Sequence, residues 1–340
     1  MTVPLRVALL GYGLAGRVIH RPLLQAVPDL ELTHVVTADP GRRGEVAADI
    51  PAARIIESAA QLWRQERDFD VVVIATNNDV HTSLARVALD LGKAVVVDKP
   101  LALSSLDGAA LASYALSNRL VLSAFHNRRW DSDTLTARAL LAAGTLGTVH
   151  RLEARFTRFR PRVQQRWREQ PGGGGVLLDL GTHLVDQATQ LLGPVSSVYA
   201  EVRSLRSGAT VDDDAVVALT HACGASSLLW CSAAAPWTGP RLVLQGSAAG
   251  WVKDDLDGQE DAQRRGAAPG PEPDGMLHDE HGSRPLPSLP GDWTQYYREL
   301  VLAVRGEGPV PVEPGDAVSV QKVLEAAADS SARQQVVHLR

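Results

Sequence analysis

Short apolar runs alternate with longer amphipathic stretches along the first third of the chain. The apolar runs are mostly unbroken by polar residues, which predicts strands covered on both faces. Strands are expected at 5–10, 30–37, 71–75, 94–97 and 120–123, and helices at 17–27, 80–91 and 104–117. Strict alternation of strand and helix predicts βαβ units in a doubly wound parallel sheet, the α/β class.

The pattern changes beyond residue 123. Apolar and polar residues alternate over 149–157, which is typical of a half-exposed antiparallel strand. Further strands are expected at 195–202, 215–221, 226–232 and 241–246, and helices at 178–192, 293–305 and 316–332. Strands in succession predict an α+β domain with an open, mostly antiparallel mixed sheet. We therefore predict two domains, 1–123 and 124–340.

Residues 253–293 differ in composition from their surroundings. This segment of 41 residues holds 12 Gly and Pro, 10 Asp and Glu, and only 4 Lys and Arg. We predict that it lacks clear secondary structure and is a lid, a partner-binding loop or disordered.

Composition then narrows the class of protein. The 340 residues are 45% hydrophobic and 21% charged, with a net charge of −5, which excludes global disorder and gives no footprint for nucleic acid or anionic membrane. Two cysteines make neither a disulfide framework nor a thiolate metal cage. The first residues lack the pattern of a signal peptide. We expect a cytoplasmic protein with no membrane partner and no metal.

A glycine motif follows the first predicted strand. Gly11-Tyr12-Gly13-Leu14-Ala15-Gly16 has the G-x-G-x-x-G spacing and opens the first predicted helix. Its glycines suit a tight turn, close approach to a diphosphate and close helix–strand packing, and the helix start favours phosphate charge. The motif predicts that domain 1–123 binds a dinucleotide.

The end of the second strand bears on which dinucleotide is bound. If the strand ends at Thr37, a hydroxyl stands where NAD sites place an acid, and Arg42 or Arg43 can meet a 2′-phosphate. If it ends at Asp39, the carboxylate can hold a free ribose diol. The sequence favours NADP and leaves NAD open.

Two later clusters carry candidate chemistry. Lys99, in Asp98-Lys99-Pro100, follows the strand expected at 94–97, at the sheet edge where ligands bind. Asp179, His183 and Asp186 are spaced i, i+4, i+7 on one helix face, after a run of four glycines. His183 can act as acid or base near neutral pH, with a carboxylate to orient it. The glycine run suits either close backbone approach or a hinge.

With these motifs in hand, the sequence resembles the glucose–fructose oxidoreductase, inositol dehydrogenase and rhizopine catabolism (Gfo/Idh/MocA) family over essentially its whole length. The marks are Gly11–Gly16, Ala75-Thr-Asn-Asn-Asp-Val-His81, Gly92-Lys-Ala-Val-Val-Val-Asp-Lys-Pro100 and Asp179-Leu-Gly-Thr-His183. Asp98 stands where the family usually has Glu, and Asn77 where it often has Pro. His126-Asn-Arg-Arg-Trp-Asp131, Arg166-Trp-Arg-Glu169, Leu180–Gln187 and Asp257-Gly-Gln-Glu-Asp261 are similar to the NADP-dependent scyllo-inositol 2-dehydrogenase branch.

The resemblance implies roles for particular residues. It implies a catalytic set of Lys99, Asp179 and His183. It implies cofactor contacts from Gly11, Tyr12, Gly13, Leu14, Ala15, Gly16, Thr37, Arg42, Thr76, Asn78, His81 and Lys99. It implies substrate contacts from Asn127, Arg128, Arg166, Trp167, Asp179 and His183. It also implies a substrate-binding C-terminal domain whose sheet forms a homo-oligomer, a dimer or a tetramer.

Together these observations predict an NADP(H)-dependent dehydrogenase that acts on a secondary hydroxyl of a cyclic polyol or sugar, of the scyllo-inositol type. The alternatives are a reductase of another ketosugar, such as 1,5-anhydro-D-fructose, and a non-catalytic NADP(H)-binding sensor. Intact Lys99, Asp179 and His183 argue against a sensor, because a sensor needs no proton relay.

Overall fold

The computed structural model describes residues 3–164 and 166–339, which divide into two compact units. The first comprises Met1–Asn127, Gln259–Pro269 and Trp293–Val318, and the second Arg128–Gly258, Gly270–Asp292 and Ser319–Arg340. The chain therefore passes from one unit to the other five times. The predicted division at residue 123 stays a prediction.

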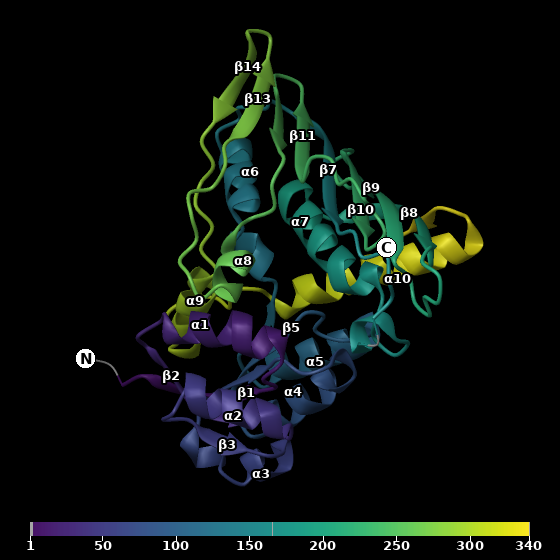
Figure 1. The fold of residues 1–340 in the computed structure, drawn as a ribbon. Coiled ribbons are helices and arrows are strands. Elements are labelled where there is room, and N and C mark those ends of the chain that lie inside the picture. The colour runs from purple at the N-terminus through teal and green to yellow at the C-terminus, as the bar shows by residue number, and fades with distance from the viewer. Residues whose placement is uncertain (1–2, 165, 340) are drawn as a thin grey trace. The chain divides into compact units, whose positions relative to one another are not determined.

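A six-stranded parallel sheet forms the centre of the first unit (Figure 1). Its strands are β1 (Leu5–Leu10), β2 (Leu30–Val36), β3 (Arg54–Ile56), β4 (Val71–Ile74), β5 (Ala94–Asp98) and β6 (Leu122–Phe125). The order β3-β2-β1-β4-β5-β6 is that of the dinucleotide-binding fold, with the change of direction between β1 and β4. The apolar runs in β1, β4 and β5 are buried on both faces, so the predicted doubly wound parallel sheet is confirmed.

Helices connect these strands. They are η1 (Ala15–His20), α1 (Arg21–Gln25), α2 (Pro40–Asp49), α3 (Ala59–Trp63), η2 (Glu66–Asp68), η3 (Asn78–Val80), α4 (His81–Asp90) and α5 (Ser105–Ser117). Later segments of the chain add α8 (Gln259–Arg264) and α9 (Thr294–Val304) to this unit. The sequence analysis did not predict β3, α2 or α3, because the first turn of α2 reads as a Pro-Gly turn. Asp39 nevertheless caps α2, accepting a hydrogen bond from the Arg42 N–H.

A nine-stranded mixed sheet forms the second unit. Its strands are β7 (Val149–Thr157), β8 (Val195–Arg203), β9 (Asp214–His221), β10 (Ser226–Ser232), β11 (Leu242–Gly246), β12 (Gly250–Lys253), β13 (Gly275–Asp279), β14 (Gly282–Leu286) and β15 (Val337–His338). In the order β14-β13-β12-β11-β7-β10-β9-β8-β15, only β7 and β10 pair in parallel. The prediction of an open, mostly antiparallel mixed sheet is therefore confirmed.

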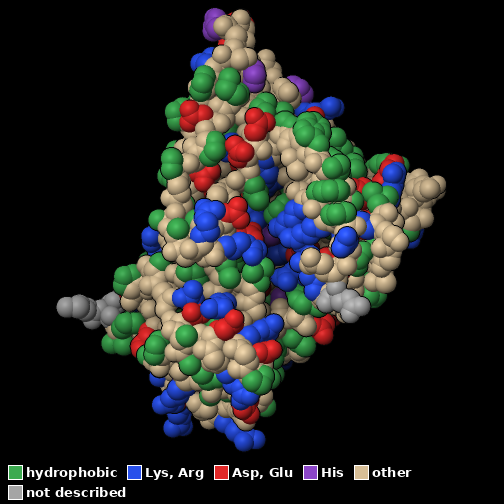
Figure 2. Space-filling model, in the orientation of Figure 1, with side chains coloured by type: hydrophobic (Ala, Val, Ile, Leu, Met, Phe, Trp, Pro, Cys, Tyr) green, Lys and Arg blue, Asp and Glu red, His purple; other side chains and the backbone are tan. Residues whose placement is uncertain are grey.

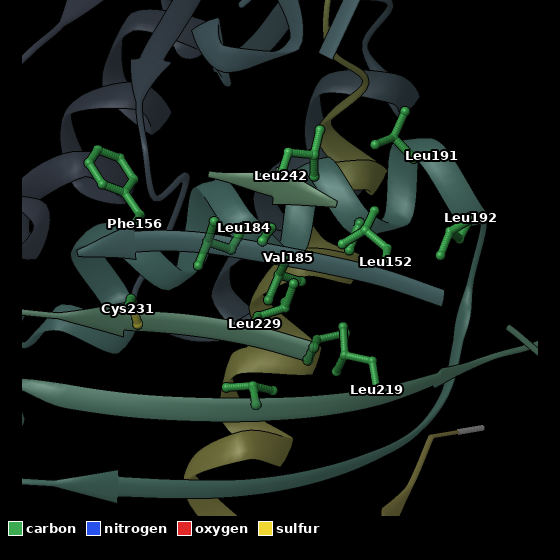
Figure 3. Close-up of a cluster of buried hydrophobic side chains, with 14 of the residues drawn as sticks. Leu152, Phe156, Leu184, Val185, Leu191, Leu192, Leu219, Leu229, Cys231 and Leu242 are labelled. Atoms are coloured by element: carbon green, nitrogen blue, oxygen red, sulfur yellow. The ribbon is translucent and has the colours of Figure 1, made fainter. Parts of the chain in front are cut away.

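Helices cover one face of this sheet and bury its apolar side chains. The helical elements are η4 (Asn127–Trp130), α6 (Ser132–Ala142), η5 (Trp167–Glu169), η6 (Leu177–Gly181), α7 (Thr182–Leu192) and α10 (Pro314–Arg333). Leu184 and Val185 of α7 point onto Leu152 of β7 and Leu229 of β10 (Figure 3). Strand residues with period two and helix residues with period 3.6 thus meet in one core. Among the described residues, no helix is long and apolar enough to cross a membrane.

The expectation for 253–293 is wrong in one respect, because the segment contains regular structure. It forms α8 and the hairpin β13–β14, and β13 pairs with β12. Leu277 of β13 is buried, and a Cβ at Gly275 would lie 2.3 Å from the Trp251 indole nitrogen. Glycine is therefore required there for close packing on a tryptophan, not for flexibility.

Candidate active site

The turn after β1 has the shape that a diphosphate requires. Gly11 adopts a positive φ of 95°, and a Cβ there would lie 2.4 Å from the Ala75 carbonyl oxygen. A Cβ at Gly16 would lie 2.1 Å from the Gly11 carbonyl oxygen. Leu14 is exposed and precedes η1, which begins at Ala15. These contacts exclude side chains from the turn, so its backbone can approach a ligand, and the residues present fit a dinucleotide.

The buried side chain of Tyr12 stabilises this turn. Its side chain is buried, and its hydroxyl donates to Asp49 at the end of α2 (3.0 Å). Arg17 donates to the same carboxylate (2.7 Å). Burial first, and then the bond to Asp49, raise the pKa of Tyr12 well above its ordinary value. The Tyr12 side chain therefore supports the loop from within the protein.

The end of β2 bears on cofactor preference. The strand ends at Val36, and Thr37 is buried with its N–H bonded to the Ile56 carbonyl (2.9 Å). Asp39 lies beyond the strand, where Oδ1 accepts the Arg42 N–H (2.9 Å). Arg43 pairs with Glu57. The Arg42 guanidinium carbon lies 3.9 Å from the Cβ position of Gly13, so Arg42 reaches the diphosphate turn.

His81 begins α4, and its contact with the cofactor stays a prediction. It is fully buried, with Nδ1 2.8 Å from the Pro100 carbonyl and Nε2 3.3 Å from the Thr76 carbonyl. The His81 ring therefore links two loops at the carboxyl edge of the sheet. Thr76 is half-buried and Asn78 is buried in the same loop, and their cofactor contacts stay predictions.

Lys99 follows β5 directly, at the carboxyl edge of the parallel sheet. Its N–H donates to Oδ1 of Asp98 (2.8 Å), and its side chain is half-buried. Burial alone would raise the pKa of Asp98, but His20 and the positive charge of Lys99 hold it below its ordinary value. An ionised carboxylate therefore stands directly before the lysine.

The second unit carries two further residues of the predicted catalytic set, Asp179 and His183. Asp179 lies in η6 and His183 in α7, which follows η6 without a break. Asp179 is half-buried, with Oδ1 3.5 Å from Nε of Arg168. His183 is 8% exposed, and its ring centroid lies 6.0 Å from that of Phe156. The histidine is thus buried beside an aromatic ring, and its role in proton transfer stays a prediction.

Asp186 has another partner. Arg129 binds both of its carboxylate oxygens, with Nη2 2.6 Å from Oδ1 and Nε 3.0 Å from Oδ2. Both side chains are buried. Through Arg129, Asp186 therefore anchors α7 to the segment before α6.

Asp212, which the sequence analysis missed, fixes the start of the same helical segment. Its Oδ2 accepts the Leu177 N–H (2.7 Å), and its carbonyl accepts the Val176 N–H (3.0 Å). A Cβ at Gly175, where φ is 109°, would lie 2.1 Å from Oδ1 of Asp212. Gly175, at the end of the glycine run, thus allows the Asp212 carboxylate to approach the backbone closely. Burial raises the pKa of Asp212, against the backbone donors that lower it.

A buried polar network continues behind α7. Gln187 donates to Thr134 (2.7 Å) and accepts from Arg241 (3.1 Å). Nε of Arg241 lies 3.3 Å from Oδ2 of Asp133. All four side chains are buried. The polar side of α7 is therefore held in one orientation, which fixes where its His183 side chain lies.

The residues implied as substrate contacts differ in their surroundings. Arg128 is buried, pairs with Asp131 (2.9 Å) and stacks over Phe156. Arg166 pairs with Glu169 (2.7 Å), and Trp167 is half-buried under the Arg168 guanidinium. Asn127 is buried in the first unit. Their contacts with a substrate stay predictions.

The histidines at the tip of the β13–β14 hairpin are exposed, in contrast to buried His183. Figure 2 shows histidine side chains at this tip, where His278 bonds to Ser283 and His281 is exposed. In the described ranges, no group of three His, Cys, Asp or Glu could hold a metal ion. Both cysteines have free thiols, Cys223 exposed and Cys231 buried.

Comparison with known proteins decides the family. Residues 5–126 match the profile described as "Oxidoreductase family, NAD-binding Rossmann fold", and residues 134–252 match "GFO/IDH/MocA C-terminal domain". The uncharacterized oxidoreductase YdgJ of Escherichia coli is 36% identical over 342 residues, 97% of each chain. The chain belongs to the Gfo/Idh/MocA family.

Two further Gfo/Idh/MocA comparisons extend over the whole chain. The scyllo-inositol 2-dehydrogenase (NADP(+)) IolW of Bacillus subtilis is 32% identical over 348 residues, 98% of this chain and 96% of its own. The solved structure of the oxidoreductase yvaA from Bacillus subtilis has a TM-score of 0.94 at 30% identity and covers 100% of this chain and 99% of its own. The predictions of the Gfo/Idh/MocA family and of an NAD(P)-dependent dehydrogenase are confirmed.

Proposed function

We propose that the chain catalyses reversible, NADP(H)-dependent oxidation of a secondary hydroxyl on a cyclic polyol or sugar of the scyllo-inositol type. The observation that carries the cofactor choice is the end of β2. Its first carboxylate, Asp39, is used as the cap of α2, and Arg42 reaches toward Gly13 of the diphosphate turn. A guanidinium there can pair with a 2′-phosphate, whereas the Asp39 carboxylate, which could hold a free ribose diol, is turned toward the start of α2.

The dinucleotide would be held by the backbone of Gly11–Gly16, by Thr37 and Arg42 at the ribose, and by the loop of Thr76 and Asn78. When bound, it supplies the nicotinamide that takes or gives the hydride. The chain's own residues supply the proton chemistry. His183 removes the hydroxyl proton during oxidation and returns it during reduction.

Lys99 and Asp179 complete the proposed machinery. The Lys99 ammonium donates a hydrogen bond to the oxygen on which negative charge develops. Asp179 orients His183 or accepts a substrate hydroxyl. Asn127, Arg128, Arg166 and Trp167 are proposed contacts with the polyol.

Similarity to IolW over nearly the whole chain supports the substrate class, because the name of that relative states scyllo-inositol and NADP⁺. The test is a panel of scyllo-inositol, other inositols, 1,5-anhydro-D-fructose and related ketosugars, each assayed with NADP(H) and with NAD(H). We expect the highest kcat/KM with scyllo-inositol and NADP⁺. A higher value with a ketosugar and NADPH would transfer the proposal to that reduction. Tight NADPH binding without turnover on any compound would favour a sensor.

We also propose that the protein is cytoplasmic and forms a homo-oligomer through the uncovered face of the nine-stranded sheet. Tyr199 of β8 and Leu228 of β10 are 40% and 41% exposed, and both pair in register with Ala218 of β9. They therefore form one row on the face opposite the core. An apolar row of this kind on a sheet suits burial against a second copy.

A further inference from the structure

His20 lies at the far end of the helical segment that the glycine motif opens. The segment η1 begins at Ala15, beside the diphosphate turn, and ends at His20, which is fully buried. The His20 ring packs on Phe125 of β6, with ring centroids 4.3 Å apart. A polar ring buried in this way needs partners for both of its nitrogens.

A hydroxyl of α9 is the partner of Nδ1, whereas Nε2 makes no hydrogen bond among the described residues and faces a carboxylate at ion-pair distance. Nδ1 lies 2.6 Å from the hydroxyl of Tyr297 in α9, which is also fully buried. Nε2 faces Oδ2 of Asp98 at 3.9 Å. A hydroxyl that donates to Nδ1 leaves the ring proton on Nε2, the nitrogen that faces the carboxylate.

Asp98 connects this pair to the lysine. Its Oδ1 accepts the Lys99 N–H (2.8 Å), while its Oδ2 faces His20. On the other side of the lysine, the Pro100 carbonyl is held by the ring of His81 (2.8 Å). Lys99 is thus flanked by two residues, each in contact with a buried histidine.

The charge of Asp98 depends on these neighbours. The titratable groups that face Asp98 are His20 from η1, Lys99 directly after β5 and His81 from α4. From α9, the Tyr297 ring contacts His20, and the Tyr296 ring contacts Tyr297. Burial raises the pKa of Tyr297 well above its ordinary value, so it remains a neutral hydroxyl. Loss of His20 would remove one of these neighbours and should therefore favour protonation of the Asp98 carboxyl.

We propose that His20 and Tyr297 are positioning residues for Lys99: they hold the Asp98 carboxylate in place, and they join the helical segment of the dinucleotide site to the lysine. The proposal rests on the proposed function for the role of Lys99, but not for its geometry. His20, the last residue of the segment that starts at the diphosphate turn, thereby helps to fix the position of Lys99, which is expected to act on the substrate.

The test uses two substitutions and a matched control. His20→Phe keeps a buried ring on Phe125 and removes both nitrogens, and Tyr297→Phe removes one oxygen atom. His34→Phe is the control, because His34 is equally buried in β2, faces the Phe69 ring at 5.9 Å and belongs to the same unit, but bonds to Thr33. Circular dichroism and thermal unfolding report whether each variant folds.

The first measurement does not require turnover. The four lysines of the chain are labelled with an acetylating reagent, and the rate at Lys99 is compared with the rate at exposed Lys322 by mass spectrometry. We expect the Lys99 rate to change by about threefold or more in His20→Phe, in the same direction in Tyr297→Phe, and not in His34→Phe. The same Lys99 rate in all four proteins would overturn the proposal.

The second measurement is kcat against pH with scyllo-inositol and NADP⁺. We expect kcat to fall about tenfold in His20→Phe, because the Asp98 carboxylate loses the imidazole that faces it, with the NADPH Kd nearly unchanged. The acid limb should move toward neutral pH, because Asp98 would protonate more readily. Normal kcat and an unmoved acid limb in a folded His20→Phe protein would also overturn it. If the wild-type protein turns over no compound, the proposed function fails, while the labelling result still decides this inference.

If His20→Phe does not fold, the Tyr297→Phe variant tests the positioning role by itself. Removing one oxygen should leave the fold intact and lower kcat less than His20→Phe does. A folded Tyr297→Phe protein that matches wild type in Lys99 labelling and in the acid limb would reject the positioning role.

Discussion

Oδ1 of Asp39 accepts the backbone N–H of Arg42 at 2.9 Å and so caps α2. The first carboxylate after β2 is thereby turned toward its own helix, and the guanidinium three residues later extends toward the glycine turn. A single cap thus arranges both features on which the proposed preference for NADP rests. It also explains why Pro40-Gly41 begins a helix in this chain.

Arg42→Gln should reduce kcat/KM for NADP⁺ by about tenfold, equivalent to about 1.4 kcal/mol, because a charge-assisted bond to the 2′-phosphate is lost. The value for NAD⁺ should hardly change. Arg43→Gln is the matched control, since Arg43 pairs with Glu57. Thr37→Asp should shift preference toward NAD by a similar factor. Equal losses with both cofactors in Arg42→Gln would contradict the proposed NADP site.

His183→Ala should lower kcat by about 10²–10⁴-fold, the range of a positioned acid–base group, while NADPH binding is retained. His221→Asn is the control, because His221 is also buried in the second unit but bonds to Gly193 and Ser227. It should lose thermal stability and keep kcat. A folded His183→Ala enzyme with more than about a tenth of wild-type kcat would remove His183 from the proton transfer.

Asp186→Asn should destabilise the protein by roughly 3–5 kcal/mol, because it removes the charge that balances buried Arg129. Urea unfolding measures the loss. The control is Asp329→Asn at an exposed pair with Arg333, where about 0.3–0.5 kcal/mol is expected. Similar losses in the two variants would show that the Arg129 pair does not anchor α7.

Acid should destabilise the first unit partly through Asp70. Hydrogen bonds from Arg6 hold the pKa of Asp70 below its ordinary value. A carboxyl with a lower pKa in the folded state contributes stability above its unfolded value of about 3.9, and loses it as the pH falls through the folded pKa. Unfolding midpoints measured from pH 7 to acid should fall less steeply below about pH 4 in Asp70→Asn. Identical slopes would exclude Asp70 as a source of the acid sensitivity.

Leu228→Glu should separate the proposed oligomer while leaving the monomer folded, because a carboxylate would be buried at the interface. Light scattering coupled to size-exclusion chromatography measures the mass. Leu116→Glu, at an exposed leucine of α5, is the control and should not change the mass. A wild-type protein that is monomeric at micromolar concentration would refute the proposed interface.

Much of the fold could be predicted from local patterns. The five predicted strands of the first third agree with the observed ones within two residues, because a buried parallel strand must be apolar throughout. The β13–β14 hairpin was missed, because its glycines and prolines resemble a loop. Its pairing with β12 depends on Trp251, which lies 24 residues before Gly275.

The candidate site was only partly predictable for the same reason. Lys99, Asp179 and His183 stand in local motifs that a sequence displays directly. Asp212, which fixes the start of η6, lies 35 residues from Leu177 and carries no motif. Tyr297 is 277 residues from His20. Supporting contacts of this kind form only when the chain folds, so spacing along the sequence does not mark them.

Because the chain crosses between its two units five times, residues that contact one another in the first unit are encoded far apart in the gene. Val312 exchanges hydrogen bonds with Ser123 of β6, and α9 brings Tyr297 to His20, so the last third of the gene completes the unit that the first third begins. A recombination event at one boundary near residue 127 would join a first part from one ancestor to an α9 from another, and would separate these partners. We therefore expect residues 20, 98 and 297 to descend together, as a single heritable unit spread over almost the whole reading frame.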